Sequence, residues 1–447
     1  MSTAVVVGGG VAGLLAARLL TDHFQRVCLV EKDAACGGLL GSIVNADGVS
    51  FDMGAHLLSD TGDPAIDALL YGWLDPADWH EFHVLRAGNY FAGAMNRDSP
   101  FPDARGLGDD AFRQGLEELR AARVGAPDER DLQSILEHRF GATIANRVIA
   151  PALRKQLGAG PAELHPDTPF VLRRIVCGDA AESRVLKEDP ALAQVVAYAS
   201  YEEGVGATRH RYPRRGGIGQ WVEGFVRRLD GVEFMTGRTV ARVEHADGVV
   251  GAVELDDGRV LPCDLLVWTI PSAMLLRAAA VPFESRPPAQ RPIGLFHLVF
   301  DRPFADPNYH VTCYDEDRAM FRATLYPALR GTPESGPFNC TVEVIGGPAA
   351  DFAAQVDAVV AELADMGITG PGARLLSSQL QVVPMGFPAT THAFMEAAAR
   401  QAELAGEHLR NALLLGRAKC PPFFTSDVLV DAYRALADIP VPAGAGG

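Results

Sequence analysis

The chain has 447 residues, of which 48% are hydrophobic, and its formal net charge is −16. This length predicts two or three structural units, and the hydrophobic content excludes a globally disordered chain. An acidic surface repels phosphate backbones and anionic lipid headgroups, so we expect neither nucleic-acid binding nor peripheral membrane binding.

The first apolar run, VVVGGGVAGLLAARLL at residues 5–20, is compatible with a signal peptide, a membrane span or a nucleotide-binding turn. The residues before it contain no Lys or Arg, although a signal peptide has positive charge there. Arg18 and Asp22 end it short of the roughly 20 apolar residues that cross a bilayer. No other segment is long and apolar enough, so we expect a protein without a membrane span.

The run divides instead into a strand pattern at residues 3–7 and a helix pattern at residues 11–20. Between them Gly8, Gly10 and Gly13 form the sequence G-x-G-x-x-G. In a dinucleotide-binding fold these glycines allow a tight turn, close approach of a pyrophosphate, and close packing of helix on strand. The run therefore predicts a dinucleotide site.

Residues on both sides of this turn extend the predicted site. Val11 and Ala12 begin the helix, whose N-terminus directs free N–H groups at the phosphates. Glu31 ends a second apolar strand pattern, 18 positions after the last glycine of the turn. A carboxylate there accepts hydrogen bonds from both ribose hydroxyls and repels a 2′-phosphate, which argues against NADP. We place Lys32 in the same site.

The following segment, KDAACGGLLGSIVNADGVSFDMGAHLLS, resembles the flavin amine oxidase superfamily. That superfamily includes protoporphyrinogen oxidases, phytoene desaturases and UDP-galactopyranose mutases. Its members carry a glycine pair after the ribose-binding acid, matched here by Gly37 and Gly38. Many relatives then have an arginine, whereas this chain has Leu39. The resemblance implies that this segment contacts FAD.

A Phe-Asp-x-Gly-x-His motif follows in the same family. It is matched here by Phe51, Asp52, Gly54 and His56. The resemblance implies that this segment, with Gly54 and His56, lies beside the isoalloxazine ring. From the residues alone, His56 is either a group of the site or a partly buried polar residue without chemistry.

Two central segments resemble the same family. Residues 211–229, RYPRRGGIGQWVEGFVRRL, match its Tyr-Pro-x-Gly-Gly pattern and predict a helix that packs on a core. Residues 231–271 predict a β-meander with hairpin turns at 247–248 and 257–258. In relatives, the valine corresponding to Val240 meets the adenine through its backbone, although an ordinary strand valine would give the same sequence.

The C-terminal segment, residues 412–436, predicts a strand, a loop and a helix. In the family this helix N-terminus, here with Asp427 and Val428, faces the flavin pyrimidine, where the helix dipole stabilises negative charge. Most oxidases have Gly-Asp before the loop. This chain has Gly416 and Arg417, as the mutases and their oxidase-like relatives do.

We expect the substrate-binding half of the chain to include residues 61–205, which predict helices, and residues 295–346, which contain strand patterns. The stretch DEDRAMFRATLYPAL resembles a mutase segment whose arginine contacts a nucleotide-sugar diphosphate, and Arg322 is its counterpart. Arg322 and Arg417 would together suit a pyrophosphate or a carboxylate, but surface ion pairing explains them equally well. Lys155 resembles a family lysine, and we favour a solvated helix face for it.

The loop after Arg417 reads AKCPPFFTSD and departs from the mutases, which hold the sugar there with Trp or Tyr. Galactopyranose isomerisation is therefore not favoured. Cys420 in this loop most simply fills space. The seven cysteines contain no C-x-x-C pair, so we expect free thiols in the cytoplasm and no metal site.

We therefore predict an α/β protein with a Rossmann-like, GR2-type FAD-binding domain and an inserted substrate domain of mixed sheet plus helices. The FAD-binding domain is discontinuous and comprises residues 1–60, 206–285 and 405–440. The substrate domain has a helical part, residues 61–205, and a sheet part, residues 286–404. Residues 441–447 are expected to form a flexible tail.

The predicted function is that of an amine oxidase-like or protoporphyrinogen oxidase-like FAD-dependent oxidoreductase, which takes a hydride from a small organic substrate onto flavin N5. Because the cofactor carries the difficult chemistry, His56, Arg322 and Arg417 are candidates for flavin-side or substrate-side contacts. Two alternatives stay open. One is a mutase-like, non-redox flavoenzyme acting on a nucleotide sugar, and the other is a non-catalytic flavin-binding protein.

Overall fold

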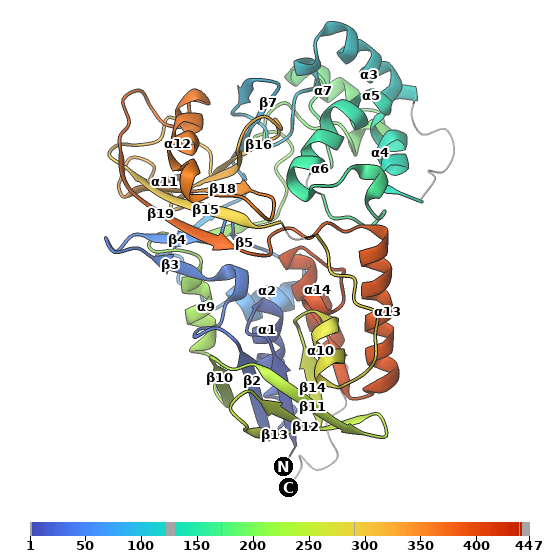
Figure 1. The fold of residues 1–447 in the computed structure, drawn as a ribbon. Helices are drawn as coiled ribbons and strands as arrows, with labels where there is room; N and C mark the ends of the chain where they lie inside the picture. Colours follow the sequence, from blue (N-terminus) through green and yellow to red (C-terminus); the bar gives the residue numbers. More distant parts are fainter. Residues whose placement is uncertain (1, 122–129, 171, 290, 438, 440–447) are drawn as a thin grey trace.

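The computed structural model describes residues 2–121, 130–170, 172–289, 291–437 and 439. The expected tail, residues 441–447, lies outside this part of the chain. Figure 1 shows a parallel sheet with its helices in the lower half, a larger sheet at the upper left and a helical lobe at the upper right. This arrangement confirms the predicted α/β class.

The lower sheet has five parallel strands in the order β10-β2-β1-β14-β20. Three separated segments of the chain supply them. The strands are β1 (Thr3–Val7), β2 (Arg26–Glu31), β10 (Val232–Thr236), β14 (Leu265–Trp268) and β20 (Ala412–Leu414). All five residues of β1 are buried, because both faces of the sheet are covered, as is usual for a parallel sheet.

One face of this sheet packs on α1 (Val11–Leu20) and α14 (Thr425–Ala437). The other face packs on α10 (Ser272–Ala278), α13 (His392–His408) and a three-stranded meander. The meander consists of β11 (Val240–Ala246), β12 (Val249–Leu255) and β13 (Val260–Pro262). Its antiparallel pairing confirms the predicted hairpins.

The upper-left sheet has seven strands in the order β19-β15-β18-β17-β16-β7-β8. The strands are β7 (Ala87–Phe91), β8 (Ala94–Asn96), β15 (Ile293–Phe300), β16 (His310–Cys313), β17 (Met320–Leu325), β18 (Phe338–Ile345) and β19 (Leu375–Val383). All neighbours are antiparallel except β16 and β7. Residues 61–205, expected to be helical, thus also supply β7 and β8. Strands this short carry too little alternation to stand out in the sequence.

The two faces of the seven-stranded sheet differ in chemistry. One face is apolar and packs on α12 (Val356–Asp365), with Leu298 and Val342 among its buried side chains. The next residues along the same strands, including His297 and Thr341, are polar and buried on the opposite face. Phe51 of the segment that leads out of the lower half contacts the His297 ring, with centroids 4.9 Å apart. The polar face is therefore turned toward the dinucleotide fold.

The helical lobe has its own apolar core. Its helices are α3 (Asp109–Ala121), α4 (Leu132–Phe140), α5 (Ala142–Ile144), α6 (Ala150–Leu157), α7 (Ala180–Leu186) and α8 (Pro190–Ala193). We expected Lys155 of α6 to lie on a solvated helix face, and this prediction is wrong. The Lys155 Nζ donates to the carbonyl oxygens of Asp315 and Met320, both at 2.7 Å, and joins the lobe to the large sheet.

Short elements connect these three parts. They are β3 (Ser42–Val44), β4 (Ser50–Asp52), β5 (Leu58–Ser59), β6 (Trp79–Phe82), β9 (His210–Pro213), α2 (Pro64–Tyr71), α9 (Gly219–Val226) and α11 (Tyr326–Leu329). Within the described ranges, no helix combines the length and the apolar character needed to cross a bilayer. The seven cysteines are free thiols.

Candidate active site

The turn between β1 and α1 has the geometry that its three glycines require. A Cβ on Gly13 would overlap the carbonyl oxygen of Gly8, so the third glycine is needed for α1 to pack against β1. A Cβ on Gly10 would meet no protein atom within 4 Å, so the space beside the second glycine is open. No side chain caps α1, which leaves the N–H groups of Val11 and Ala12 available. The turn can therefore receive an anionic group.

Glu31 lies at the end of β2 beside this turn. Its Oε2 accepts the Gly9 N–H at 2.6 Å, and its Oε1 accepts the Asp33 N–H at 2.9 Å. The carboxylate is thus held in place beside the glycine turn. Lys32 differs, because its side chain is 70% exposed and its ammonium pairs with Asp33 at 2.8 Å.

The second glycine pair lies against the first turn. The Gly37 N–H donates to the Gly9 carbonyl at 2.8 Å, and a Cβ on Gly38 would lie 3.4 Å from the Gly10 Cα. Leu39 is 45% exposed and stands outside this contact. Two glycine turns and one fixed carboxylate therefore lie side by side, in an arrangement that leaves room for a bulky anionic ligand.

Val240 begins β11 close to the same end of the sheet. Two residues earlier, the Arg238 N–H donates to the Glu31 carbonyl at 3.0 Å. Val240 itself pairs with Leu255 and is half-buried. The meander therefore starts next to the backbone of Glu31.

The segment with Gly54 and His56 leads from the lower half to the polar face of the large sheet. Gly54 has φ +116°, and a Cβ there would lie 3.1 Å from the Glu343 Oε1. The same carboxylate accepts the Ala55 N–H at 3.3 Å. A glycine is therefore required at position 54 by both the backbone conformation and the closeness of β18.

The C-terminal segment meets the first turn of α1. A Cβ on Gly416 would lie 3.2 Å from the Ala12 Cβ and 3.7 Å from a methyl group of Val428. Asp427 and Val428 lie in the first turn of α14, whose N-terminus thus stands near that of α1. Residues 12 and 416, which are far apart in the sequence, meet at one point.

A cavity of about 280 Å³ lies between these segments and the polar face of the large sheet. The N-termini of α1 and α14 and residues 55–59 line one side of it. His310 and Arg322 come from the large sheet, and His210 comes from β9. The remaining lining residues are Leu40, Tyr71, Leu85 and Trp221. No carboxylate lines the cavity.

Three histidines of the cavity have lowered pKa values. Burial, followed by the charge of Arg322, lowers the pKa of His56 to about 4 and that of His310 to about 3. Burial also lowers the pKa of His210, whose Nδ1 lies 2.8 Å from the Ser59 Oγ. All three rings are therefore neutral at pH 7 and can donate or accept one hydrogen bond at each nitrogen. No sequence motif marks His210 and His310, because only strand pairing brings them to the same cavity as His56.

Arg322 is engaged within the protein. Its Nε and Nη2 donate to the two carboxylate oxygens of Glu343 at 2.7 and 2.9 Å. Glu343 is only 2% exposed, so this is a buried, bidentate ion pair. We expected Arg322 either to bind a pyrophosphate or carboxylate of a ligand or to form a surface ion pair. The structure shows an ion pair, but it is buried, and Arg322 lines the cavity.

Arg417 has the opposite environment. It makes no hydrogen bond or ion pair within the described ranges, and its side chain is exposed to water. The surrounding protein nevertheless desolvates the guanidinium and lowers its pKa. Arg417 is exposed, and it is not among the described residues that line the cavity with Arg322. Arg417 is thus an uncompensated positive charge next to Gly416.

Asp52 connects the cofactor side to the substrate side. Its carboxyl group accepts hydrogen bonds from Ser42 Oγ and Tyr212 OH, both at 2.6 Å, and from the Ile218 N–H at 2.9 Å. Burial raises its pKa to about 6. The Asp52 N–H donates to Tyr326 OH at 2.8 Å. Asp52 therefore fixes the segment that carries His56.

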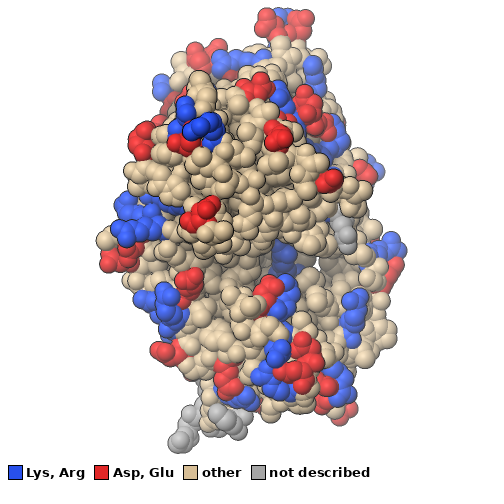
Figure 2. All heavy atoms as spheres, turned by 60° about the vertical axis from the view of Figure 1, so that its left-hand side comes forward, with Lys and Arg blue, Asp and Glu red and all other residues tan. Residues whose placement is uncertain are grey.

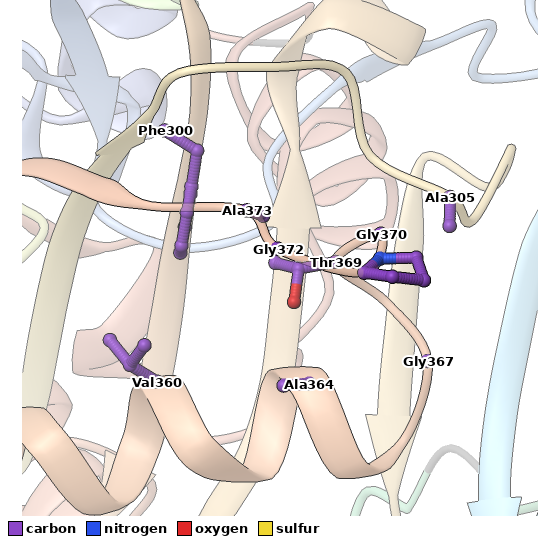
Figure 3. Close-up of a pocket in the computed structure, with 10 residues that line it drawn as sticks. Phe300, Ala305, Val360, Ala364, Gly367, Thr369, Gly370, Gly372 and Ala373 are labelled. Atoms are coloured by element: carbon purple, nitrogen blue, oxygen red, sulfur yellow. The ribbon is translucent and has the colours of Figure 1, made fainter.

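A second hollow, of about 270 Å³, lies between α12 and the loop that follows it (Figure 3). Phe300, Val360 and Ala364 line it together with the glycine-rich residues 367–373. It has no titratable side chain, so we assign it no acid–base chemistry.

Comparison with known proteins agrees with this geometry. Residues 11–371 match the family described as flavin containing amine oxidoreductase. No curated protein matches the chain by sequence.

Several solved structures share the fold. A reduced UDP-galactopyranose mutase is 17% identical with a TM-score of 0.74, over 98% of this chain and 92% of that one. A putative protoporphyrinogen oxidase from Exiguobacterium sp. 255-15 is 15% identical with a TM-score of 0.69, over 98% of each chain. An oxidoreductase from Methanosarcina mazei is 14% identical with a TM-score of 0.65, over 98% and 100% of the two chains. At such identities the likeness is one of fold.

Proposed function

The chain belongs to the family of flavin containing amine oxidoreductases, and on this premise we propose that it takes a hydride from a small organic substrate bearing an anionic group. The protein is a flavin-dependent enzyme with FAD as its cofactor and a small molecule as its substrate. The alternative of a non-catalytic flavin-binding protein is therefore set aside.

The two glycine turns, Glu31 and the start of α1 support a specific assignment of cofactor contacts. We assign the diphosphate to the N–H groups of Val11 and Ala12, and the ribose to Glu31. The Gly37–Gly38 pair borders the diphosphate, and the backbone at Val240 borders the adenine. Residues near 54–56, 416 and 428 border the ring, because they line the cavity or meet the end of α1. When bound, FAD supplies the acceptor for the substrate hydride.

The anionic group is proposed on one observation, the uncompensated charge of Arg417. A partly desolvated guanidinium without a protein partner is stabilised by a bound carboxylate or phosphate. The cavity has no carboxylate in its lining that could hold an ammonium group. An ordinary cationic amine therefore fits it poorly.

The remaining polar groups orient the substrate. Neutral His56 and His310 can each accept a proton or donate a hydrogen bond. The ion pair of Arg322 with Glu343 holds the roof of the cavity and, through the Ala55 N–H, the segment with His56. Leu40, Leu85 and Trp221 exclude water from one side. Seven free thiols suit a reducing compartment, and we propose the cytoplasm.

An anaerobic flavin-reduction experiment tests whether the enzyme prefers substrates that carry a negative charge. Purified protein is mixed anaerobically with matched pairs of compounds, such as amino acids and the amines that remain after decarboxylation. Loss of the oxidised-flavin absorption should occur with the carboxylate-bearing member of a pair. Arg417→Ala should raise KM for that compound by about 10–100-fold, and Arg417→Lys by less, because a charge-assisted hydrogen bond contributes about 1.5–3 kcal/mol. Bleaching by amines alone would refute the anionic substrate.

A mutase-like reaction remains the second candidate, since the fold resembles that of a reduced UDP-galactopyranose mutase. It is less favoured because Glu343 already occupies the fork of Arg322. Reduced protein is incubated with UDP-galactopyranose, and the product is separated by chromatography. Formation of an isomer at catalytic turnover would replace the oxidoreductase proposal.

A further inference from the structure

The strand β19 forms one edge of the seven-stranded sheet. Its antiparallel pairing with β15 runs from Val383 opposite Ile293 to Leu375 opposite Phe300. In the described part of the chain no strand pairs with its outer side. None of its nine residues is buried, whereas every residue of β15 is. In Figure 1 this strand lies at the left of the molecule.

Charged side chains and proline, which usually protect an open strand, are absent from this edge, although its pairing with β15 shifts register between Ser377 and Leu375. Residues 375–395 contain no Asp, Glu, Lys or Arg, although 21% of the chain is charged. Natural edge strands are commonly blocked by charges or Pro, whereas the nearest proline here, Pro384, follows the strand. Figure 2, which brings the left-hand side of Figure 1 forward, shows a broad area with few charges across the upper half. An uncharged edge of this length is suited to pairing with another strand.

The residue pattern of β19 identifies the partner. The sequence LLSSQLQVV is apolar at both ends and mostly polar in the middle, so it reads similarly in both directions. Antiparallel pairing of two copies about Gln379 places Leu376 opposite Val382 and Ser377 opposite Gln381. Leu376 and Val382 are 61% and 47% exposed, and each would cover the other. A two-fold interface requires this self-complementarity.

Net charge favours the same partner. Two molecules of charge −16 repel each other, so they associate most easily through a surface that contributes no charge. A strongly basic partner would gain no attraction from this strand. We propose that β19 pairs antiparallel with β19 of a second copy of this chain, so that the large sheet continues across a symmetric dimer.

Sedimentation velocity of the FAD-loaded protein at micromolar concentration tests this inference. The wild type should have the mass of two chains. Gln379→Lys, which places two positive charges against each other at the axis, should give the mass of one chain. Gln379→Ser should remain a dimer, and so should Val260→Lys, because Val260 is also exposed but lies on the edge strand β13 of a different sheet.

A pair of substitutions tests the register. Leu376→Lys alone should dissociate the dimer, whereas Leu376→Lys combined with Val382→Glu should restore it, because the two charges then face each other. Unchanged flavin absorption per chain and an unchanged melting temperature show that each variant is folded. The proposal is overturned if the wild-type particle contains only one copy of the chain, whether that copy sediments alone or bound to a different protein. A dimer that tolerates Gln379→Lys does so as well.

Discussion

The five-stranded and the seven-stranded sheets are buried to a similar depth but with different chemistry. Every residue of β1 is apolar or Thr and packs on a covered face. In β15 and β18, apolar residues alternate with His297, Thr341 and Glu343, and these polar groups are buried as well. Buried polar groups must be hydrogen-bonded, and here the partners lie on neighbouring strands. The cofactor half therefore depends on backbone shape, and the substrate half on pairs of side chains.

The largest expected effect comes from breaking the buried ion pair between Arg322 and Glu343 beside the cavity. Glu343→Leu should lower the free energy of unfolding by about 3–5 kcal/mol, because it leaves Arg322 without its partner. Arg322→Met combined with Glu343→Leu should recover most of that loss while activity stays low. Urea denaturation measures both variants. If the double variant is as unstable as the sum of the single ones, the two side chains do not act as a pair.

A comparison of two glycines tests the cofactor half. Gly13→Ala should lower the free energy of unfolding by about 3 kcal/mol, because the added methyl group overlaps the Gly8 carbonyl. Gly10→Ala should leave the stability of the apoprotein nearly unchanged, since no protein atom is near, and weaken FAD binding by at least about 10-fold. Thermal melts of apoprotein and FAD titrations separate the two effects. Equal loss of stability in both variants would contradict the assigned geometry.

Asp52 joins the two halves and should give a pH signature. Its pKa of about 6 in the folded protein lies above its ordinary value of 3.8, so its contribution is complete below pH 3.8 and is lost as pH rises through about 6. The amount is about 3 kcal/mol. His56 and His297, with pKa values lowered to about 4, act in the opposite direction and lose their contribution as pH falls.

The difference in unfolding free energy between wild type and Asp52→Asn isolates this term, because the histidines are common to both proteins. The wild type should lose about 2 kcal/mol relative to the variant between pH 4 and pH 7, because part of the full effect is already lost at pH 4. Denaturation at a series of pH values provides the measurement. A difference that does not change with pH would show that Asp52 is ionised throughout.

The smallest effect concerns the ribose contact. Glu31→Gln should weaken FAD binding by about 10–100-fold, because a hydrogen bond to a charged acceptor contributes about 1.5–3 kcal/mol. Lys32→Ala is the matched control, and it should change the affinity by less than about 0.5 kcal/mol, since its ammonium lies at the surface with Asp33. Titration of apoprotein with FAD measures both. Equal losses would place Lys32 in the site.

The cofactor-binding half could be predicted from the sequence because the contacts that define it are formed by residues close together in the chain. Gly8, Gly10 and Gly13 lie within one turn, and the position of Glu31 follows from one strand, one helix and the next strand. The sequence also predicted the meander, since its hairpin turns are formed by adjacent residues. Short-range spacing is enough where the backbone itself is the ligand-binding group.

Only the tertiary structure determined which side chains lie together in the substrate-binding half. His210, His310 and Glu343 lie on separate strands, and only the register of those strands brings them to the segment with His56. It also distinguished Arg322, which is neutralised by a carboxylate 21 residues away, from Arg417, which is left uncompensated. In the sequence both are single arginines near aromatic residues. Their difference depends on which charges the folded sheet places beside them, and spacing along the chain does not encode that distance.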